Sequence, residues 1–246
     1  MSHRFFLGGH DLEMVTIGEL LRECGVPFHD KRLGWGARAS AYREEIEAAL
    51  AAGEAPVFVE LQLDLDLPGE HVVVVDHHGE RAGGDKPSSL RQVFSLLKLP
   101  PERWTRRLAL VEANDIGHVR AMQALGASLE EMQAIRHADR AAQGVTEADE
   151  TAARGAIEAR FESPGREFTV VRISHTRASA VADLMDETLG GPGFRNLVVV
   201  SPSEVNVFGE GWLVSLLNAL LPGGWLGGAL PERGFFGHAR PESSQS

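Results

Sequence analysis

Four consecutive valines, at positions 72–75, run directly into Asp76, His77 and His78. Side chains of neighbouring residues in a strand point to opposite faces of the sheet. A strand that is apolar on both faces is therefore typical of a parallel sheet that helices cover on both sides. The rest of the N-terminal half agrees, because apolar strand-like segments alternate there with segments of helical periodicity. We predict an α/β fold with a parallel β-sheet flanked by helices.

The predicted elements divide the chain into three parts. An N-terminal domain at residues 1–126 holds predicted strands at 4–9, 56–63 and 71–76 and predicted helices at 11–24, 40–53, 88–97 and 101–115. Two polar helices with weak apolar faces form a predicted helical connector at 127–163. Residues 164–246 show a strand–helix–strand pattern and are predicted to form a smaller α/β domain.

The composition restricts the class of protein. The 246 residues carry a formal net charge of −11, which opposes binding to a long nucleic acid because phosphate groups would be repelled. Cys24 is the only cysteine, so we expect neither an internal disulfide nor a thiolate zinc site, and a single thiol fits a reducing compartment. The sequence shows no run of 18 apolar residues and no signal peptide. We therefore expect a cytoplasmic protein that does not bind a membrane.

Polar side chains near the ends of the predicted strands are candidates for chemistry. In a parallel sheet, ligands bind beyond the carboxyl ends of the strands, which is where the Asp-His-His sequence lies. His10, Asp11 and Glu13 stand between the first predicted strand and the first helix. Asp11 could equally be a simple helix cap, because a carboxylate accepts hydrogen bonds from the free N–H groups at a helix N-terminus.

Further acids extend this set of candidates. Glu60 interrupts an apolar run that should be buried, and a buried carboxylate must be paired, protonated or bound to a cation. Asp64 lies just beyond it and is the alternative, although the alternation around Asp64 also fits a half-exposed edge strand. Asp115 follows Asn114 at the end of a predicted helix, where an ordinary helix stop would look the same.

The combination of side chains indicates which metal ions would bind. Carboxylates and imidazoles without thiolates suit Mn²⁺, Mg²⁺, Fe²⁺ or Co²⁺ better than a structural zinc ion. Two such ions about 3.5–4 Å apart can share a water molecule that loses its proton near neutral pH and attacks phosphorus. We therefore expect a site for two divalent ions, with Mn²⁺ as the cofactor and Mg²⁺ or Co²⁺ as alternatives.

The order of these motifs resembles the DHH phosphoesterase superfamily, whose members include single-strand exonucleases, cyclic-dinucleotide phosphodiesterases, exopolyphosphatases and manganese pyrophosphatases. Three segments carry the resemblance: "VVVVDHHGE" at 72–80, the serine-initiated helix "PSSLRQVFSLL" at 87–97, and the glycine-rich "GGWLGGALPERGFFGH" at 223–238. The resemblance implies a DHH domain followed by a DHHA1-like substrate-binding domain.

The resemblance also implies roles for individual residues. The expected metal ligands are His10, Asp11, Glu13, Glu60, His77 and Asp115. The expected catalytic residues are Asp76, His77 and His78. Asp76 would orient a histidine, and His78 would meet a phosphate oxygen. The expected substrate contacts are His78, Gly224, Gly227, Gly228, Arg233 and His238. The glycines could instead only make turns around Trp225.

The sequence departs from the family pattern in its first motif. Leu7 stands where many members have a histidine four residues before the first aspartate, and His10 is adjacent to Asp11 instead. Glu13 and Glu60 occupy places where aspartate is usual, and the longer side chain displaces a carboxylate by about one methylene. The chain is therefore either an active two-metal-ion phosphoesterase or a diverged, catalytically inactive nucleotide-binding or scaffold protein.

The sequence indicates only the chemical class of the substrate and leaves the oligomeric state open. We expect a phosphodiester, phosphomonoester or phosphoanhydride of a small nucleotide-like compound, or a short oligonucleotide. A homodimer and a monomer both stay open. The segment at 32–42, which carries glycines and Trp35, is either a flap beside the pocket or a packed turn.

Overall fold

The computed structural model describes residues 2–67, 72–78 and 86–240, and the chain divides into two compact units. The first unit comprises the residues up to Ala127 together with His137–Gln143. The second comprises Ser128–Arg136 and the residues from Gly144 onward. Helix α6 (Leu129–Ala142) is therefore divided between the two units.

The first unit contains a four-stranded sheet in which all neighbouring strands are parallel, as predicted. The strand order is β2-β1-β3-β4. The strands are β1 (His3–Leu7), β2 (Phe28–Asp30), β3 (Ala55–Val59) and β4 (Val73–Val75). Leu7 pairs in register with Val59, and Val59 pairs with Val75. The carboxyl ends of β1, β3 and β4 are therefore level at one edge of the sheet.

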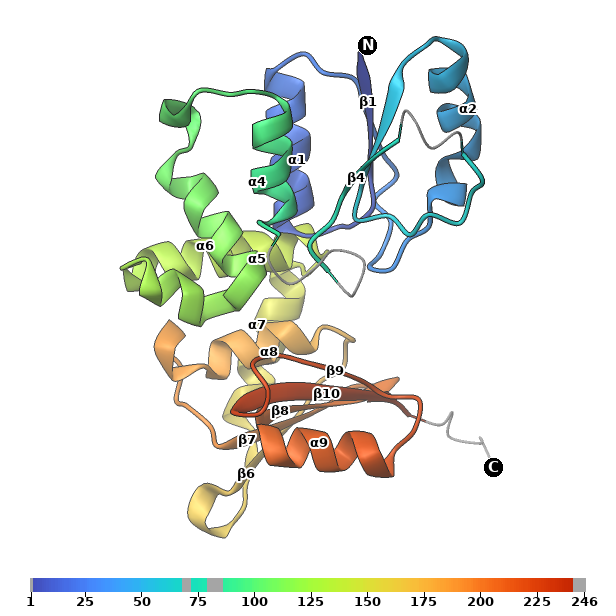
Figure 1. Ribbon diagram of the computed structural model, residues 1–246. Helices are drawn as coiled ribbons and strands as arrows, with labels where there is room; N and C mark the ends of the chain where they lie inside the picture. Colours follow the sequence, from blue (N-terminus) through green and yellow to red (C-terminus); the bar gives the residue numbers. More distant parts are fainter. Residues whose placement is uncertain (1, 68–71, 79–85, 241–246) are drawn as a thin grey trace. The chain divides into compact units, whose positions relative to one another are not determined.

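Helices flank this sheet on both sides: α1 (Leu12–Glu23) and α4 (Ser89–Leu96) lie on one side and α2 (Arg43–Ala51) on the other (Figure 1). Ile46 of α2 packs in one apolar cluster with Phe6 of β1 and Phe58 of β3. Tyr42, at the end of the 3₁₀ helix η1 (Ala39–Tyr42), completes this cluster and donates a hydrogen bond to the carbonyl of Leu7 at 2.7 Å.

The valine-rich strand β4 lies at an edge of this sheet, where among the described residues it pairs with β3 alone. Val74 is 40% exposed. The expectation that both faces of the valine run are covered is wrong at Val74, because the face of the edge strand that carries Val74 is partly open to solvent.

Helix α5 (Arg106–Ala124) begins after Thr105, whose hydroxyl accepts a hydrogen bond from the backbone N–H of Leu108. The predicted start of this helix at residue 101 is wrong, because Pro101 begins a separate 3₁₀ helix, η3 (Pro101–Arg103). The long helix is kinked at Gly117 and His118, and the φ angle of His118 is +54°. Asp115 therefore lies just before a break in the helix.

The second unit contains a six-stranded mixed sheet with the strand order β5-β6-β7-β8-β10-β9. Its strands are β5 (Phe161–Glu162), β6 (Phe168–Arg172), β7 (Asn196–Val200), β8 (Glu204–Glu210), β9 (Trp225–Gly227) and β10 (Arg233–Ala239). Its further helices are α7 (Glu147–Glu158), η4 (Pro164–Arg166), α8 (Ala178–Met185), η5 (Glu187–Leu189) and α9 (Gly211–Leu220). The predicted strand–helix–strand pattern corresponds to β6, α8 and β7, and antiparallel strands extend it.

The core of the second unit contains residues from both the predicted connector at 127–163 and the predicted domain at 164–246. Ala153 of α7 packs in one buried cluster with Val171 of β6, Val181 of α8 and Leu197 of β7. Helix α7 thus contributes to the core of this unit. Within the described residues, no helix combines the length and the apolar character that crossing a membrane requires.

Candidate metal centre

Glu60 and the Asp-His-His sequence lie at neighbouring strand ends in the first unit. Glu60 directly follows β3, and Asp76 directly follows β4. Because β3 and β4 are parallel neighbours, Glu60 and Asp76 lie at the same edge of the sheet. This is the location that the sequence predicted for the chemistry.

Glu60 has a backbone conformation that residues other than glycine rarely adopt, with a φ angle of +53°. Its N–H donates to the carbonyl of Val75 at 2.9 Å. Gly8 leaves room for its carbonyl oxygen, which a Cβ atom at position 8 would overlap. The Ser89 hydroxyl donates to Glu60 Oε1 at 2.8 Å. Residues that neighbouring structure holds in such a conformation cluster at functional sites.

His77 lies at the centre of a group of carboxylates. Its Nε2 atom is 2.9 Å from Asp115 Oδ2, 3.4 Å from Glu60 Oε1 and 3.8 Å from Glu13 Oε2. The side chain of His77 is only 9% exposed. Residues from α1, β3, β4 and α5 therefore converge on one imidazole.

Three atoms of this group are buried and make no hydrogen bond with any described residue: Glu13 Oε2, His77 Nε2 and Asp115 Oδ2. The other oxygen of Glu13, Oε1, accepts a hydrogen bond from the backbone N–H of Leu90 at 2.8 Å. Only Oε2 of this carboxylate is therefore without a hydrogen bond. The two carboxylate oxygens meet His77 Nε2 only as ion pairs, at 2.9 Å from Asp115 and 3.8 Å from Glu13, and buried polar atoms that make no hydrogen bond are rare in native proteins. The three atoms lie within 4.8 Å of one another, so a single divalent cation among them would satisfy all three.

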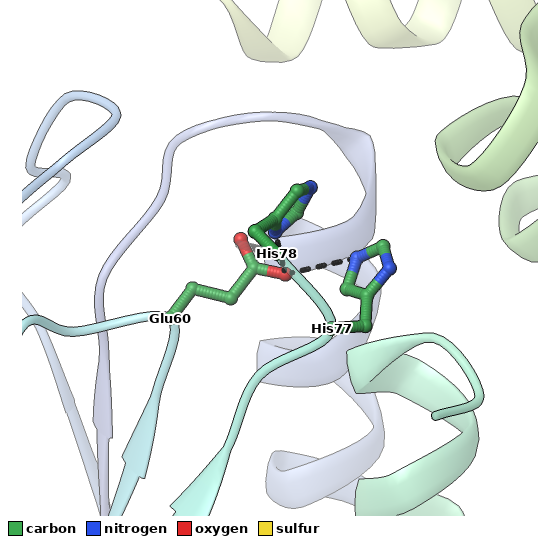
Figure 2. A group of neighbouring side chains, drawn as sticks. All are labelled: Glu60, His77 and His78. Atoms are coloured by element: carbon green, nitrogen blue, oxygen red, sulfur yellow. Dashed lines mark ion pairs between the residues drawn. The ribbon is translucent and has the colours of Figure 1, made fainter. Parts of the chain in front are cut away.

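A second group of ligand atoms adjoins the first and shares His77 with it. Glu60, His77 and His78 also offer ligand atoms within 4.8 Å of one another, and Figure 2 shows both imidazoles beside the Glu60 carboxylate. His78 Nδ1 is 3.5 Å from Glu60 Oε1. Asp76 accepts a hydrogen bond from the backbone N–H of His78 at 2.8 Å and so fixes the turn on which both histidines lie.

The pKa values of the cluster report its excess negative charge. Burial and the nearby carboxylates of Asp115 and Glu60 raise the pKa of Glu13 well above its ordinary value. Burial, together with the Glu60 and Asp115 carboxylates, raises the pKa of Asp11 to about 7. Burial by itself would lower the pKa of His77, but the Asp115, Glu60 and Glu13 carboxylates outweigh it and raise the pKa to about 10. A bound divalent cation would supply the positive charge that protons supply here.

The remaining predicted ligands lie at different places around this centre. Asp11 is the N-cap of α1 and accepts a hydrogen bond from the N–H of Met14 at 2.9 Å, so its capping role is confirmed. It also lies near Glu60, because a Cβ atom added at Gly9 would contact both carboxylates, at 3.6 Å from Asp11 Oδ2 and 3.7 Å from Glu60 Oε2. His10 is half-buried and belongs to neither group of ligand atoms. Asp64 accepts two hydrogen bonds from Ser40 and also lies outside both groups.

Two positioning residues of the centre were not singled out from the sequence. Ser88 caps α4, which leaves the adjacent Ser89 to donate a hydrogen bond to Glu60, whereas the sequence predicted only that a serine begins this helix. Asp139 of α6 accepts a hydrogen bond from the N–H of Leu12 at 3.1 Å and is one of the carboxylates that raise the pKa of Asp11. Nothing in the polar sequence around Asp139 distinguishes it from a solvated acid.

The predicted substrate contacts near the C-terminus lie in the second unit. Cβ atoms at Gly224 and Gly227 would overlap the rings of Phe236 and Phe235, so these glycines allow aromatic rings to lie against the sheet. Gly228 has a φ angle of +101° and leaves room for the backbone of Gly234.

The charged residues of the same segment contact other residues of the second unit. Arg233 donates to the carbonyl of Arg195 at 3.2 Å, and its guanidinium lies 5.4 Å from the ring centre of Phe194. His238 Nδ1 lies 2.6 Å from the carbonyl oxygen of Ala239. These contacts give the segment a structural role, and its contact with substrate stays a prediction.

Comparison of the sequence with known families finds no match, and no curated protein matches it either. Solved structures do resemble it. RecJ from Thermus thermophilus in complex with Mn²⁺ aligns with 97% of this chain at 15% identity and a TM-score of 0.51. This chain spans 50% of that RecJ chain. The DHH domain of a member of a ribosomal protein family aligns with 96% of this chain and 82% of its own, at 12% identity and a TM-score of 0.55.

Both likenesses extend over nearly the whole chain, while their sequence identities are too low to say more than how the chain folds. The chain therefore shares its fold with these structures, one of which is a DHH domain, and this is the fold that its motifs implied.

Proposed function

We propose that this protein is a two-metal-ion phosphoesterase that hydrolyses a phosphodiester, phosphomonoester or phosphoanhydride of a small nucleotide-like compound or a short oligonucleotide. The observation that supports it best is the convergence of three buried atoms without hydrogen bonds, from Glu13, His77 and Asp115. The fold is shared with metal-dependent hydrolases, and the RecJ structure that resembles this chain contains Mn²⁺.

The two groups of ligand atoms would hold one ion each. Glu13 and Asp115 serve the first, Glu60 and His78 serve the second, and His77 lies between them. Divalent ions held by these residues would lower the pKa of a bound water and neutralise charge on phosphoryl oxygens.

The chain's own groups hold these ligands in place. The Ser89 hydroxyl and the Leu90 N–H fix the carboxylates of Glu60 and Glu13, and Asp76 fixes the turn that carries His78. Asp11, beside Glu60, is a further carboxylate that a cation could recruit. Mn²⁺ is the ion we expect, with Mg²⁺ or Co²⁺ as alternatives.

The test combines metal content with turnover. The purified chain should bind about two Mn²⁺ ions and hydrolyse bis-p-nitrophenyl phosphate in their presence. Asp115→Asn keeps the shape of the side chain and removes one ligand charge, so turnover should fall by more than about 100-fold. Asp66→Asn makes the same chemical change at an exposed aspartate outside both ligand groups and should leave turnover unchanged.

The competing interpretation is a diverged protein without catalysis, and the glutamates at positions 13 and 60 are its support. Such a protein would purify without stoichiometric Mn²⁺ and hydrolyse neither the chromogenic diester nor nucleotide esters. That combination of results would refute the proposal.

A further inference from the structure

A cavity of about 870 Å³ opens beside the metal centre, within the first unit. Gly8, Glu60, Asp76 and His78 form the side of the cavity that belongs to the centre. Its volume is in the range that binds small organic ligands, which is about 300–1,000 Å³. The rest of the lining includes residues that the proposed hydrolysis does not use: Trp35, Gly36, Arg38, Gln62, Leu63, Asp64 and Lys86.

Trp35 is the most unusual member of this lining, because its side chain is 86% exposed. The indole of Trp35 is therefore accessible to a ligand in the cavity, to which it offers a large apolar face and a polar N–H. Backbone hydrogen bonds connect the segment that carries Trp35 to the metal centre. Gln62, which follows Glu60 by two residues, forms these bonds with the two neighbours of Arg38. Its N–H donates to the carbonyl of Ala37, and its carbonyl accepts from the N–H of Ala39, both at 2.9 Å.

Polar groups accompany the indole. The guanidinium of Arg38 and the ammonium of Lys86 line the cavity and form no hydrogen bond with the described part of the chain. The charge of Arg38 adds to the hydrogen bonds from Ser40 in lowering the pKa of Asp64. The side-chain amide of Gln62 lies beside Gly36 and is likewise not hydrogen bonded to a described residue. The acid on this side, Asp64, has its two oxygens occupied by Ser40.

This combination fits one class of ligand. An exposed indole offers a stacking platform for a nucleobase, an amide can bond the edge of that base, and two cations can meet a phosphate. An inorganic pyrophosphate or polyphosphate has no aromatic ring to stack on the indole and no base edge to form hydrogen bonds with the amide. The cavity therefore matches a nucleotide whose phosphate end points toward the carboxylates and histidines.

We propose that this cavity is a nucleoside subsite, in which the base stacks on Trp35, Gln62 bonds its edge, and Arg38 and Lys86 contact its phosphate. The proposal rests on the hydrolase function proposed above and narrows its substrate to nucleotidyl compounds. It assigns the segment at 32–42 to the pocket, which is one of the two alternatives that the sequence left open.

The test measures binding by calorimetry on the full chain, with AMP and with inorganic phosphate, each in the presence and in the absence of Mn²⁺. AMP should bind more tightly than phosphate. Trp35→Ala should raise the dissociation constant of AMP about tenfold and leave that of phosphate unchanged, and Trp35→Phe should retain most of the affinity. Trp212→Ala is the matched control, because Trp212 is an exposed tryptophan in the second unit, and AMP binding should not change.

A separate titration with Mn²⁺ distinguishes this proposal from the one on which it rests. If Mn²⁺ binds but AMP binds no better than phosphate, or Trp35→Ala binds AMP as the wild type does, the subsite is wrong and the hydrolase proposal stands. If Mn²⁺ does not bind, the hydrolase proposal is wrong, and the AMP titrations without Mn²⁺ still decide whether Trp35 holds a base.

Discussion

His77 Nε2 lies 2.9 Å from Asp115 Oδ2, yet neither atom makes a hydrogen bond with a described residue. Two ligands that meet at right angles on one ion at 2.0–2.1 Å stand about 3 Å apart, which is the separation seen here. The two side chains are therefore placed as neighbours on a common cation would be. Several consequences of this arrangement can be measured.

Replacing Glu13 with glutamine should weaken metal binding and stabilise the metal-free protein. The amide keeps an oxygen to accept the Leu90 N–H and removes a buried charge that lies close to Asp115 and Glu60. In EDTA the variant should melt roughly 2–4 °C above the wild type, which corresponds to about 1 kcal/mol for a chain of this size. Mn²⁺ should raise the melting temperature of the wild type and not that of the variant. A variant that melts lower in EDTA would contradict the repulsion inferred here.

Mn²⁺ affinity should increase with pH between 6 and 8. The pKa of His77 is raised to about 10, so the metal-free centre holds a proton on this imidazole throughout the interval. The pKa of Asp11 is raised to about 7, so this carboxylate holds a second proton at the acid end and loses it as the pH rises.

Because the metal must displace these protons, the dissociation constant should fall by about tenfold per pH unit for each proton released. Calorimetry in buffers of different ionisation enthalpy counts those protons directly. A pH-independent affinity would show that the metal binds elsewhere.

Adjacent serines offer a matched pair of variants at the start of α4. Ser89→Ala removes the hydrogen bond to Glu60 and should lower turnover by about 10–100-fold, as for other groups that orient metal ligands. Ser88→Ala removes the helix cap and should cost about 1 kcal/mol of unfolding free energy with turnover retained. Steady-state kinetics and thermal melts of both variants test the assignment, which fails if the two serines exchange roles.

Gly8→Ala should disturb both the fold and the centre. The added Cβ atom would overlap the carbonyl oxygen of Glu60, so the strand end that carries this ligand must move. Overpacking of this kind costs about 1–3 kcal/mol, and the displacement should also weaken Mn²⁺ binding.

Gly155→Ala is the control for that variant, because Gly155 lies in helix α7 with open space around it. Alanine there should stabilise the protein by about 0.5–1 kcal/mol. Denaturant unfolding gives both values, and equal behaviour of the two variants would show that the contact at Gly8 carries no constraint.

Local sequence patterns alone were enough to predict much of the secondary structure of the first unit. The alternation of strands and helices predicted the parallel sheet, and the Asp-His-His sequence after the valine run marked its carboxyl edge. The caps at Asp11 and at Ser128 with Glu131 were also predictable, because they depend on residues within one turn of each other.

Contacts between distant segments could be decided only by the tertiary structure. The sequence offered Glu60 and Asp64 as alternative acids near a strand end, and the left-handed backbone of Glu60 turned the first toward His77 while Ser40 engaged the second. The exposure of Val74, the role of Ser89 and the approach of Asp139 to α1 likewise depend on which strands and helices become neighbours.

The physical reason is the range of the interactions involved. Periodicity and capping act within a few residues, so the chain itself determined its strands, its helices and the chemical types available at their ends. Burial and the field of nearby charges act through space, so only the packed structure decided which carboxylates share His77 and which atoms are left without a partner.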